Sequence, residues 1–211
     1  MTHRQEAARE TRRKIIEAGL ALVRSGGFGA VSVEAITRAA GVAKGTFYVH
    51  FPSKEHLATE LCLEPYEALS REVLASKGTL PRRLGRLFRG WARVADASGV
   101  EVVREWYRIA FQPAEAAELV LVFFTRDRAV IETLLREAAA AGELRPGAPI
   151  DSVADVLYAQ MQGLTAVWCM TAGASDRLLP SVERFLRNHL PALLAPFLAP
   201  AARPQSPKEI P

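Results

Sequence analysis

Apolar residues recur at intervals of three or four along most of the chain, and no stretch alternates as a half-buried strand would. This period places apolar side chains on one face of an α-helix. The pattern predicts about nine helices and therefore an all-α protein. Most prolines fall at expected helix starts, in connections or in the C-terminal tail, which supports this division of the chain.

Three of the predicted helices precede residue 53. The first ends at glycines 26 and 27, because glycine readily takes the left-handed conformation that closes a helix. The second covers about residues 33–40, with Ser32 as its N-cap and Gly41 at its end. The third covers about residues 44–50, and Pro52 prevents a smooth continuation.

The remaining helices are longer and more apolar. Ser53 caps the first of them, in which Pro65 is expected to cause a kink. Five more are expected at about 81–97, 100–111, 113–142, 151–172 and from 176 or 180 to 197. Asp151 is expected to cap the fourth, and Pro191 is a candidate for a bend in the fifth. Residues 199–211 have too little apolar surface to bury and are expected to be a disordered tail.

The second and third helices have the spacing of a helix-turn-helix motif. Their inward-facing positions are apolar or small: Ile36, Ala39, Ala40, Val42, Phe47 and Phe51. A recognition helix needs such a face to anchor it, and an outer face of hydrogen-bond donors that enters the major groove of DNA. The outer face here carries Lys44, Gly45, Thr46, Tyr48 and His50.

Individual residues of this outer face also have ordinary structural explanations. A lone lysine is usually solvated, Tyr48 suits the rim of a core, and His50 suits a helix end. The DNA-binding interpretation rests on their combination. Lys44 lies at a helix N-terminus, where backbone N–H groups attract phosphate, and Lys54 follows the turn within reach of a flanking phosphate.

Two stretches, "RRKIIEAGLALVRSGGFGAVSVEAI" and "AITRAAGVAKGTFYVHFPSKEHL", resemble the N-terminal domain of tetracycline-repressor-type (TetR/AcrR) family transcriptional regulators. The resemblance covers about residues 10–60. The turn glycine, Lys-Gly-Thr, the aromatic pair, His-Phe and Ser-Lys occur in order at fixed spacing. Thr37 and Ala43 depart from the alanine and serine common in the family, and Ala43 leaves the recognition helix less well capped.

The resemblance implies a ligand-responsive homodimer that binds a DNA operator, usually as a repressor, and needs no cofactor. A helix-turn-helix domain would cover residues 1–52, and a helical ligand-binding and dimerisation domain residues 53–198. The family's DNA-contacting positions fall on Ser32, Lys44, Gly45, Thr46, Tyr48, His50 and Lys54. Of these, Ser32, Tyr48 and Lys54 would mainly contact phosphates.

Beyond residue 60 the expectations rest on the pattern alone. The helix from residue 151 and the last helix each carry two apolar stripes, so each must be buried on most of its circumference. The simplest arrangement is a four-helix interface between two copies of the chain. The predicted interface residues are Val153, Leu157, Leu164, Val182, Leu186 and Leu190. The alternative is that both stripes are buried within one chain.

Aromatic residues of the middle helices are candidates for a pocket that binds a small, largely apolar effector. The predicted lining residues are Trp91, Trp106, Tyr107, Phe111, Phe123, Tyr158, Met161, Gln162 and Trp168. Aromatic residues at helical spacing are more often plain core, and that alternative stays open. The arginines at 82, 86, 89 and 93 form a basic stripe, for which a solvated, glutamate-paired face is favoured over a site for an anionic ligand.

Composition narrows the function classes. The net charge is +4, and residues 1–60 contribute +3 of it, with nine Lys/Arg against six Asp/Glu. The balanced charge of the remainder argues against a protein that coats DNA over a large surface. The four histidines are scattered, with no metal-ligand spacing or nucleophile motif, so we expect neither a metal site nor an enzyme. The chain lacks an apolar stretch long enough to cross a membrane, and we expect a cytoplasmic protein with Cys62 and Cys169 as buried thiols.

Overall fold

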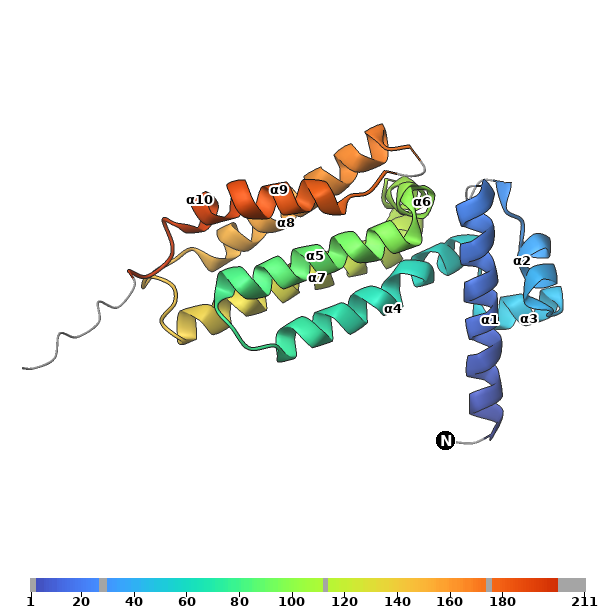
Figure 1. Cartoon of the computed structure of the whole chain (residues 1–211). Coiled ribbons are helices and arrows are strands. Elements are labelled where there is room, and N and C mark those ends of the chain that lie inside the picture. The colour runs from blue at the N-terminus through green and yellow to red at the C-terminus, as the bar shows by residue number, and fades with distance from the viewer. Residues whose placement is uncertain (1–2, 27–29, 112–113, 174–175, 201–211) are drawn as a thin grey trace, which may run out of the picture.

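The computed structural model describes residues 3–26, 30–111, 114–173 and 176–200. These residues form ten α-helices, which confirms the all-α prediction (Figure 1). The β-structure within this part of the chain is limited to an isolated antiparallel bridge between Leu144 and Leu198. None of the helices described is long and apolar enough to cross a membrane.

The N-terminal helices are α1 (His3–Gly26), α2 (Val33–Ala40) and α3 (Lys44–His50). In Figure 1 α1 stands across the end of the long helices, and α2 and α3 lie on its far side. The predicted ends of α2 are confirmed: the Ser32 hydroxyl accepts a hydrogen bond from the N–H of Ala35 at 3.1 Å, and Gly41 has a φ of 68°. The predicted bounds of α3 are also confirmed.

The larger part of the chain contains α4 (Lys54–Ala75), α5 (Leu80–Ser98), α6 (Val100–Ala110), α7 (Ala114–Ala140), α8 (Ile150–Thr171), α9 (Leu179–Asn188) and α10 (Leu190–Leu194). The predicted last helix is thus two helices, because Pro191 has no N–H to bond the carbonyl of Arg187. Pro149 rather than Asp151 occupies the cap position of α8, and Asp151 lies in its first turn, where the helix dipole favours an acid.

Two clusters of buried residues hold the fold together. The larger one fills the space between α4, α5, α7, α8, α9 and α10, and α6 contributes Val100 and Val103 to it. The smaller one joins Ile15, Ile36 and Phe47 of the N-terminal helices to Leu57 of α4 and to α6, which contributes Val102, Trp106 and Ile109. The packing therefore crosses the predicted domain boundary at residue 52.

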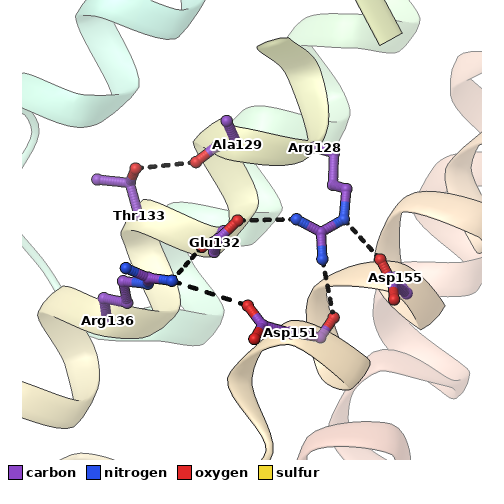
Figure 2. A network of polar contacts seen from close by, with 7 residues as sticks. All are labelled: Arg128, Ala129, Glu132, Thr133, Arg136, Asp151 and Asp155. Carbon is purple, nitrogen blue, oxygen red and sulfur yellow. Dashed lines mark hydrogen bonds and ion pairs between the residues drawn. The ribbon is translucent and has the colours of Figure 1, made fainter. Parts of the chain in front are cut away.

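Helix α8 is fixed to its neighbours at both ends. Near its N-terminus the guanidinium of Arg128 on α7 contacts Asp155 at 2.5 Å and the Asp151 carbonyl at 3.3 Å, within the network of Figure 2. At its C-terminus Arg104 of α6 donates hydrogen bonds to the carbonyls of Cys169 and Ala172, both at 2.7 Å. These bonds satisfy carbonyls that have no partner within the helix.

The C-terminal residues return to the loop between α7 and α8. The N–H of Ala199 donates to the carbonyl of Glu143 at 2.8 Å, next to the Leu144–Leu198 bridge. Position 199 is therefore anchored, contrary to the predicted start of the tail. Residues 201–211 of that tail lie outside the described part of the chain.

Candidate DNA-binding surface and effector site

The inner face of α3 is fully buried. Phe47 is 0% and Phe51 1% exposed, and their ring centroids are 5.6 Å apart. They pack in one cluster with Ile15 of α1 and Ile36 of α2. Since three helices share this cluster, it fixes the orientation of α3, as the sequence pattern predicted.

The outer face of α3 carries most of the predicted DNA-contacting residues. Lys44 and Gly45 are exposed and Tyr48 is 50% exposed, whereas Thr46 and His50 are half-buried. Val49 was missed by the sequence analysis and is 80% exposed. Its position four residues after Gly45 was the available signal, and an apolar side chain there suits contact with the methyl group of thymine.

Gly45 is not required by the internal packing of the chain. A Cβ atom built at this position meets nothing within 4 Å. A glycine inside a helix costs about 0.5–1 kcal/mol relative to alanine. Because the fold does not need this glycine, the close approach of an external partner to the backbone of α3 is the better explanation for it.

Lys44 forms an ion pair that the sequence analysis did not predict. Its Nζ donates to Oε1 of Glu34 on α2 at 2.5 Å, and both side chains are more than half exposed. The hydrogen bond from Lys44 lowers the pKa of Glu34, and the same bond raises the pKa of Lys44. Without DNA, Glu34 therefore pairs with Lys44 and places a negative charge next to the N-terminus of α3.

Replacing Glu34 with glutamine is expected to strengthen DNA binding about three- to tenfold at low salt, because Lys44 loses its competing partner and phosphates lose a repelling charge. Fluorescence anisotropy with labelled duplex DNA measures the change. Glu72→Gln makes the same substitution on an exposed site of α4 and should leave the affinity unchanged. Weaker or unchanged binding by E34Q would show that the pair does not compete with DNA.

The other predicted contacts and basic residues have partners within the chain. Lys54 is half-buried and its Nζ donates to the carbonyl of Val31 at 3.1 Å. Ser32 remains exposed although its hydroxyl caps α2. Arg12 pairs with Glu60 at 2.6 Å and lies over the ring of Phe51, so it joins α1 to its neighbours.

The predicted effector-binding residues do not all lie in one place in the structure. Trp91, Met161 and Trp168 are buried in the larger core, with Tyr107 and Tyr158 packed against it. Tyr107 donates a hydrogen bond to Oε1 of Gln162 at 2.6 Å, and Nε2 of Gln162 donates to the Tyr158 hydroxyl at 2.7 Å. The structure thus brings together a row of three polar side chains, Tyr107, Gln162 and Tyr158, which joins α6 to α8.

Two other predicted effector-binding residues lie apart from this row, and the side chain of a third is not described. Trp106 belongs to the smaller core beside the N-terminal helices, because it lies on the face of α6 that meets α1. Phe111 ends α6 and is 82% exposed, so it lines no enclosed pocket within the chain. The side chain of Phe123 lies outside what the structure describes.

The predicted dimer interface also needs correction. Val153, Leu157, Val182 and Leu190 are at most 4% exposed, and Leu186 is 8% exposed. They belong to the core of the chain itself, and Leu164 packs against that core. The exposed face of α8 carries a different apolar and small-residue row, which we call the α8 stripe: Val156, Ala159, Gly163, Val167 and Met170.

One arginine of the basic stripe forms an ion pair within the chain. Arg89 of the basic stripe pairs with Glu183 of α9 at 2.7 Å, rather than with a glutamate of α4. Among the residues that the structure describes, no group of three His, Cys, Asp or Glu side chains is placed to hold a metal ion.

Comparison with known proteins agrees with this geometry. Residues 15–61 match the family model described as bacterial regulatory proteins, tetR family. The chain is 40% identical over 96 residues to the HTH-type transcriptional repressor KstR of Mycolicibacterium smegmatis. That match covers 42% of this chain and 47% of the relative, so it spans about half of the relative's length.

Solved structures resemble the whole fold. A putative TetR-family transcriptional regulator from Mesorhizobium loti superposes with a TM-score of 0.72 over 94% of this chain and 100% of its own, at 22% identity. The regulator FadR of Bacillus subtilis in complex with stearoyl-CoA has a TM-score of 0.66 over 83% of this chain and 97% of its own, at 18% identity. At these identities the likeness concerns the fold alone.

Proposed function

We propose that this chain, which belongs to the tetR family of bacterial regulatory proteins, is a DNA-binding transcriptional repressor that a small, largely apolar effector releases from its operator. The observation that carries the proposal is the division of α3. Phe47 and Phe51 anchor one face, and Lys44, Gly45, Tyr48 and Val49 are exposed on the other. The proposal assigns the chain no catalysis and places it in the cytoplasm with its DNA.

The active form in this proposal is a homodimer. Two copies of α3 must lie about 34–36 Å apart to enter successive major grooves on one side of a duplex. The α8 stripe is the surface we assign to the second copy, since Val156, Val167 and Met170 are 48–73% exposed on one helix face. A two-fold axis would place this stripe against itself.

The proposed release mechanism passes through α6. Arg104 and Tyr107 bond α6 to α8, whereas Val102 and Trp106 of the same helix lie in the core of the N-terminal helices. An effector that binds better when α8 and α6 shift would favour a dimer with the wrong spacing of its α3 helices. A difference of about 3 kcal/mol between the two states would lower operator affinity roughly a hundredfold.

The test is a binding titration with the duplex that flanks the protein's own gene, against a scrambled duplex of the same length and composition. We expect tighter binding to the native duplex and a log–log salt slope of about −0.9 for each phosphate contacted. Equal binding of both duplexes would contradict a sequence-specific regulator, and no binding to either would contradict any DNA-binding role.

Replacing Lys54 with alanine is expected to weaken binding to both duplexes alike and to reduce the salt slope by about one unit. The reason is that Lys54 lies at the start of α4, beside α3, where it is proposed to contact a phosphate rather than a base. Lys77→Ala, on an exposed site after α4, is the matched control. A salt slope that K54A leaves unchanged would remove Lys54 from the phosphate contacts.

A further inference from the structure

A buried acid lines a cavity between α4 and α7. The cavity has a volume of about 250 Å³, and its wall includes Tyr66 and Ser70 of α4 and Asp127 and Val130 of α7. Asp127 is only 7% exposed. None of the described residues donates a hydrogen bond to its carboxyl group, and burial raises the pKa of Asp127 to about 8. A buried carboxyl without a partner is costly, which makes it a candidate for a functional site.

The charged residues near the cavity do not neutralise Asp127. Arg126 pairs with Glu67 at 2.7 Å, and both side chains are about half exposed, so this pair lies at the rim. Arg71 is also at the rim and exposed. The charge of these groups is screened by water, whereas the carboxyl of Asp127 is largely shielded from it.

The other polar groups of the cavity wall mainly offer lone pairs. The Ser70 hydroxyl donates its hydrogen to the carbonyl of Tyr66 at 2.9 Å, and the Tyr66 hydroxyl donates to the carbonyl of Trp91 at 3.5 Å. The Ser70 oxygen keeps lone pairs that can accept a hydrogen bond. Inside the charged rim a molecule therefore meets hydroxyl oxygens and the acid Asp127, which favours a ligand that donates hydrogen bonds.

The row of Tyr107, Gln162 and Tyr158 lies near this acid. Burial is the main cause of the raised pKa of Tyr158, and the nearby charge of Asp127 is the second. Gln162 holds the Tyr158 hydroxyl at 2.7 Å and Tyr107 holds Gln162 at 2.6 Å. A change at Asp127 is thus connected through α8 to α6, the helix that also packs against the N-terminal helices.

We propose that this cavity is the effector site and that it binds a small, mostly apolar molecule through a protonated amine, with the Asp127 carboxylate as the counter-ion. This inference rests on the proposed function and specifies its effector class. A neutral alcohol would be served by asparagine without the cost of burying an acid, and above about pH 8, where Asp127 is ionised, its carboxylate would repel an anion. An ammonium group supplies Asp127 with a counter-charge and hydrogen-bond donors inside the cavity, away from the arginines at its rim.

Three probes of equal chain length test the proposal at pH 9, above the raised pKa of Asp127, where octylamine, octan-1-ol and octanoate carry a positive, zero and negative charge. Isothermal titration of the full-length protein without DNA measures each affinity. We expect octylamine to bind about 10- to 100-fold tighter than octan-1-ol, as a charge-assisted hydrogen bond in a buried site provides, and octanoate to bind most weakly. In Asp127→Asn, a substitution of equal size, the preference for the amine should disappear.

Glu72→Gln is the matched control, since it removes one negative charge from an exposed site of α4 outside the cavity wall and should preserve the amine preference. Circular dichroism establishes that each variant is folded, and the comparison of three probes on the unmodified protein stands without any variant. Equal affinities for amine and alcohol, tighter binding of octanoate, no binding of any probe, or an amine preference that survives in D127N would each overturn the proposal. The readout contains no DNA, so it is separate from the test of operator binding.

Discussion

Replacing Phe47 with alanine is expected to lower the free energy of unfolding by about 3–5 kcal/mol, the usual cost of removing a buried phenylalanine. Phe47 is 0% exposed and shares its cluster with residues of α1, α2, α4 and α6. The cavity would loosen α3 most, because this helix has only seven residues and no side-chain cap. Urea denaturation followed by circular dichroism measures the change, and operator affinity should fall with it.

Val49→Ala provides the control within the same helix. Val49 is 80% exposed, so its truncation should change the free energy of unfolding by less than about 0.5 kcal/mol. Similar stability losses in the two variants would mean that the face carrying Phe47 is not the one that anchors α3. The assignment of the outer face to DNA would then fail as well.

Replacing Val167 with glutamate is expected to turn the proposed homodimer into monomers and to abolish tight operator binding. Val167 is 53% exposed in the chain and lies within the α8 stripe. A two-fold interface would bury two copies of the new charge, and an uncompensated buried charge costs about 3–5 kcal/mol. The dissociation constant of the dimer should therefore rise at least about a hundredfold. Analytical ultracentrifugation measures it.

Ala129→Glu places the same charge on an exposed site of α7 and should leave the dimer intact. If V167E sediments as a dimer while it remains folded, the α8 stripe is not the interface. Leu186→Glu is not a suitable probe of the interface, because Leu186 is 8% exposed and its replacement would disturb the core of the chain itself.

The local chemistry of the sequence was sufficient for the ends of the short helices. Ser32 and Ser53 cap the N-termini of α2 and α4, and Gly41 ends α2, as predicted from the sequence. These positions were predictable because a cap bonds backbone groups only a few residues away. The inner and outer faces of α3 were also predictable, because its large aromatic anchors, Phe47 and Phe51, are spaced four residues apart and therefore lie on one side of the helix.

The larger part of the chain was less predictable for a physical reason. Helix α8 carries apolar residues on several faces, and the period alone does not say which face meets the chain's own core. Val153 and Leu157 are buried there, whereas Val156 and Val167 are exposed, although all four are aliphatic. The choice depends on how far α7 and α9 reach around α8, which is a property of the whole fold.

The contacts and burial of individual charged residues could not be predicted from the sequence either. Glu34 and Lys44 are ten positions apart, and their contact depends on the turn between α2 and α3. The importance of Asp127 likewise arises from its burial. Asp127 lies between two charged residues, Arg126 and Arg128, on α7. This sequence context does not indicate that the Asp127 side chain points inward.

The sharing of α6 between the two cores limits how the protein can be recombined. A chimera that joins residues 1–52 to the effector domain of another regulator would discard Leu57 and the Val102, Trp106 and Ile109 surface that completes the smaller core. Such a hybrid would contain the DNA-binding helices without the surface on which they pack. A functional graft would have to carry the start of α4 and the matching side of α6 as well, so the effective module for exchanging specificities is discontinuous in the gene.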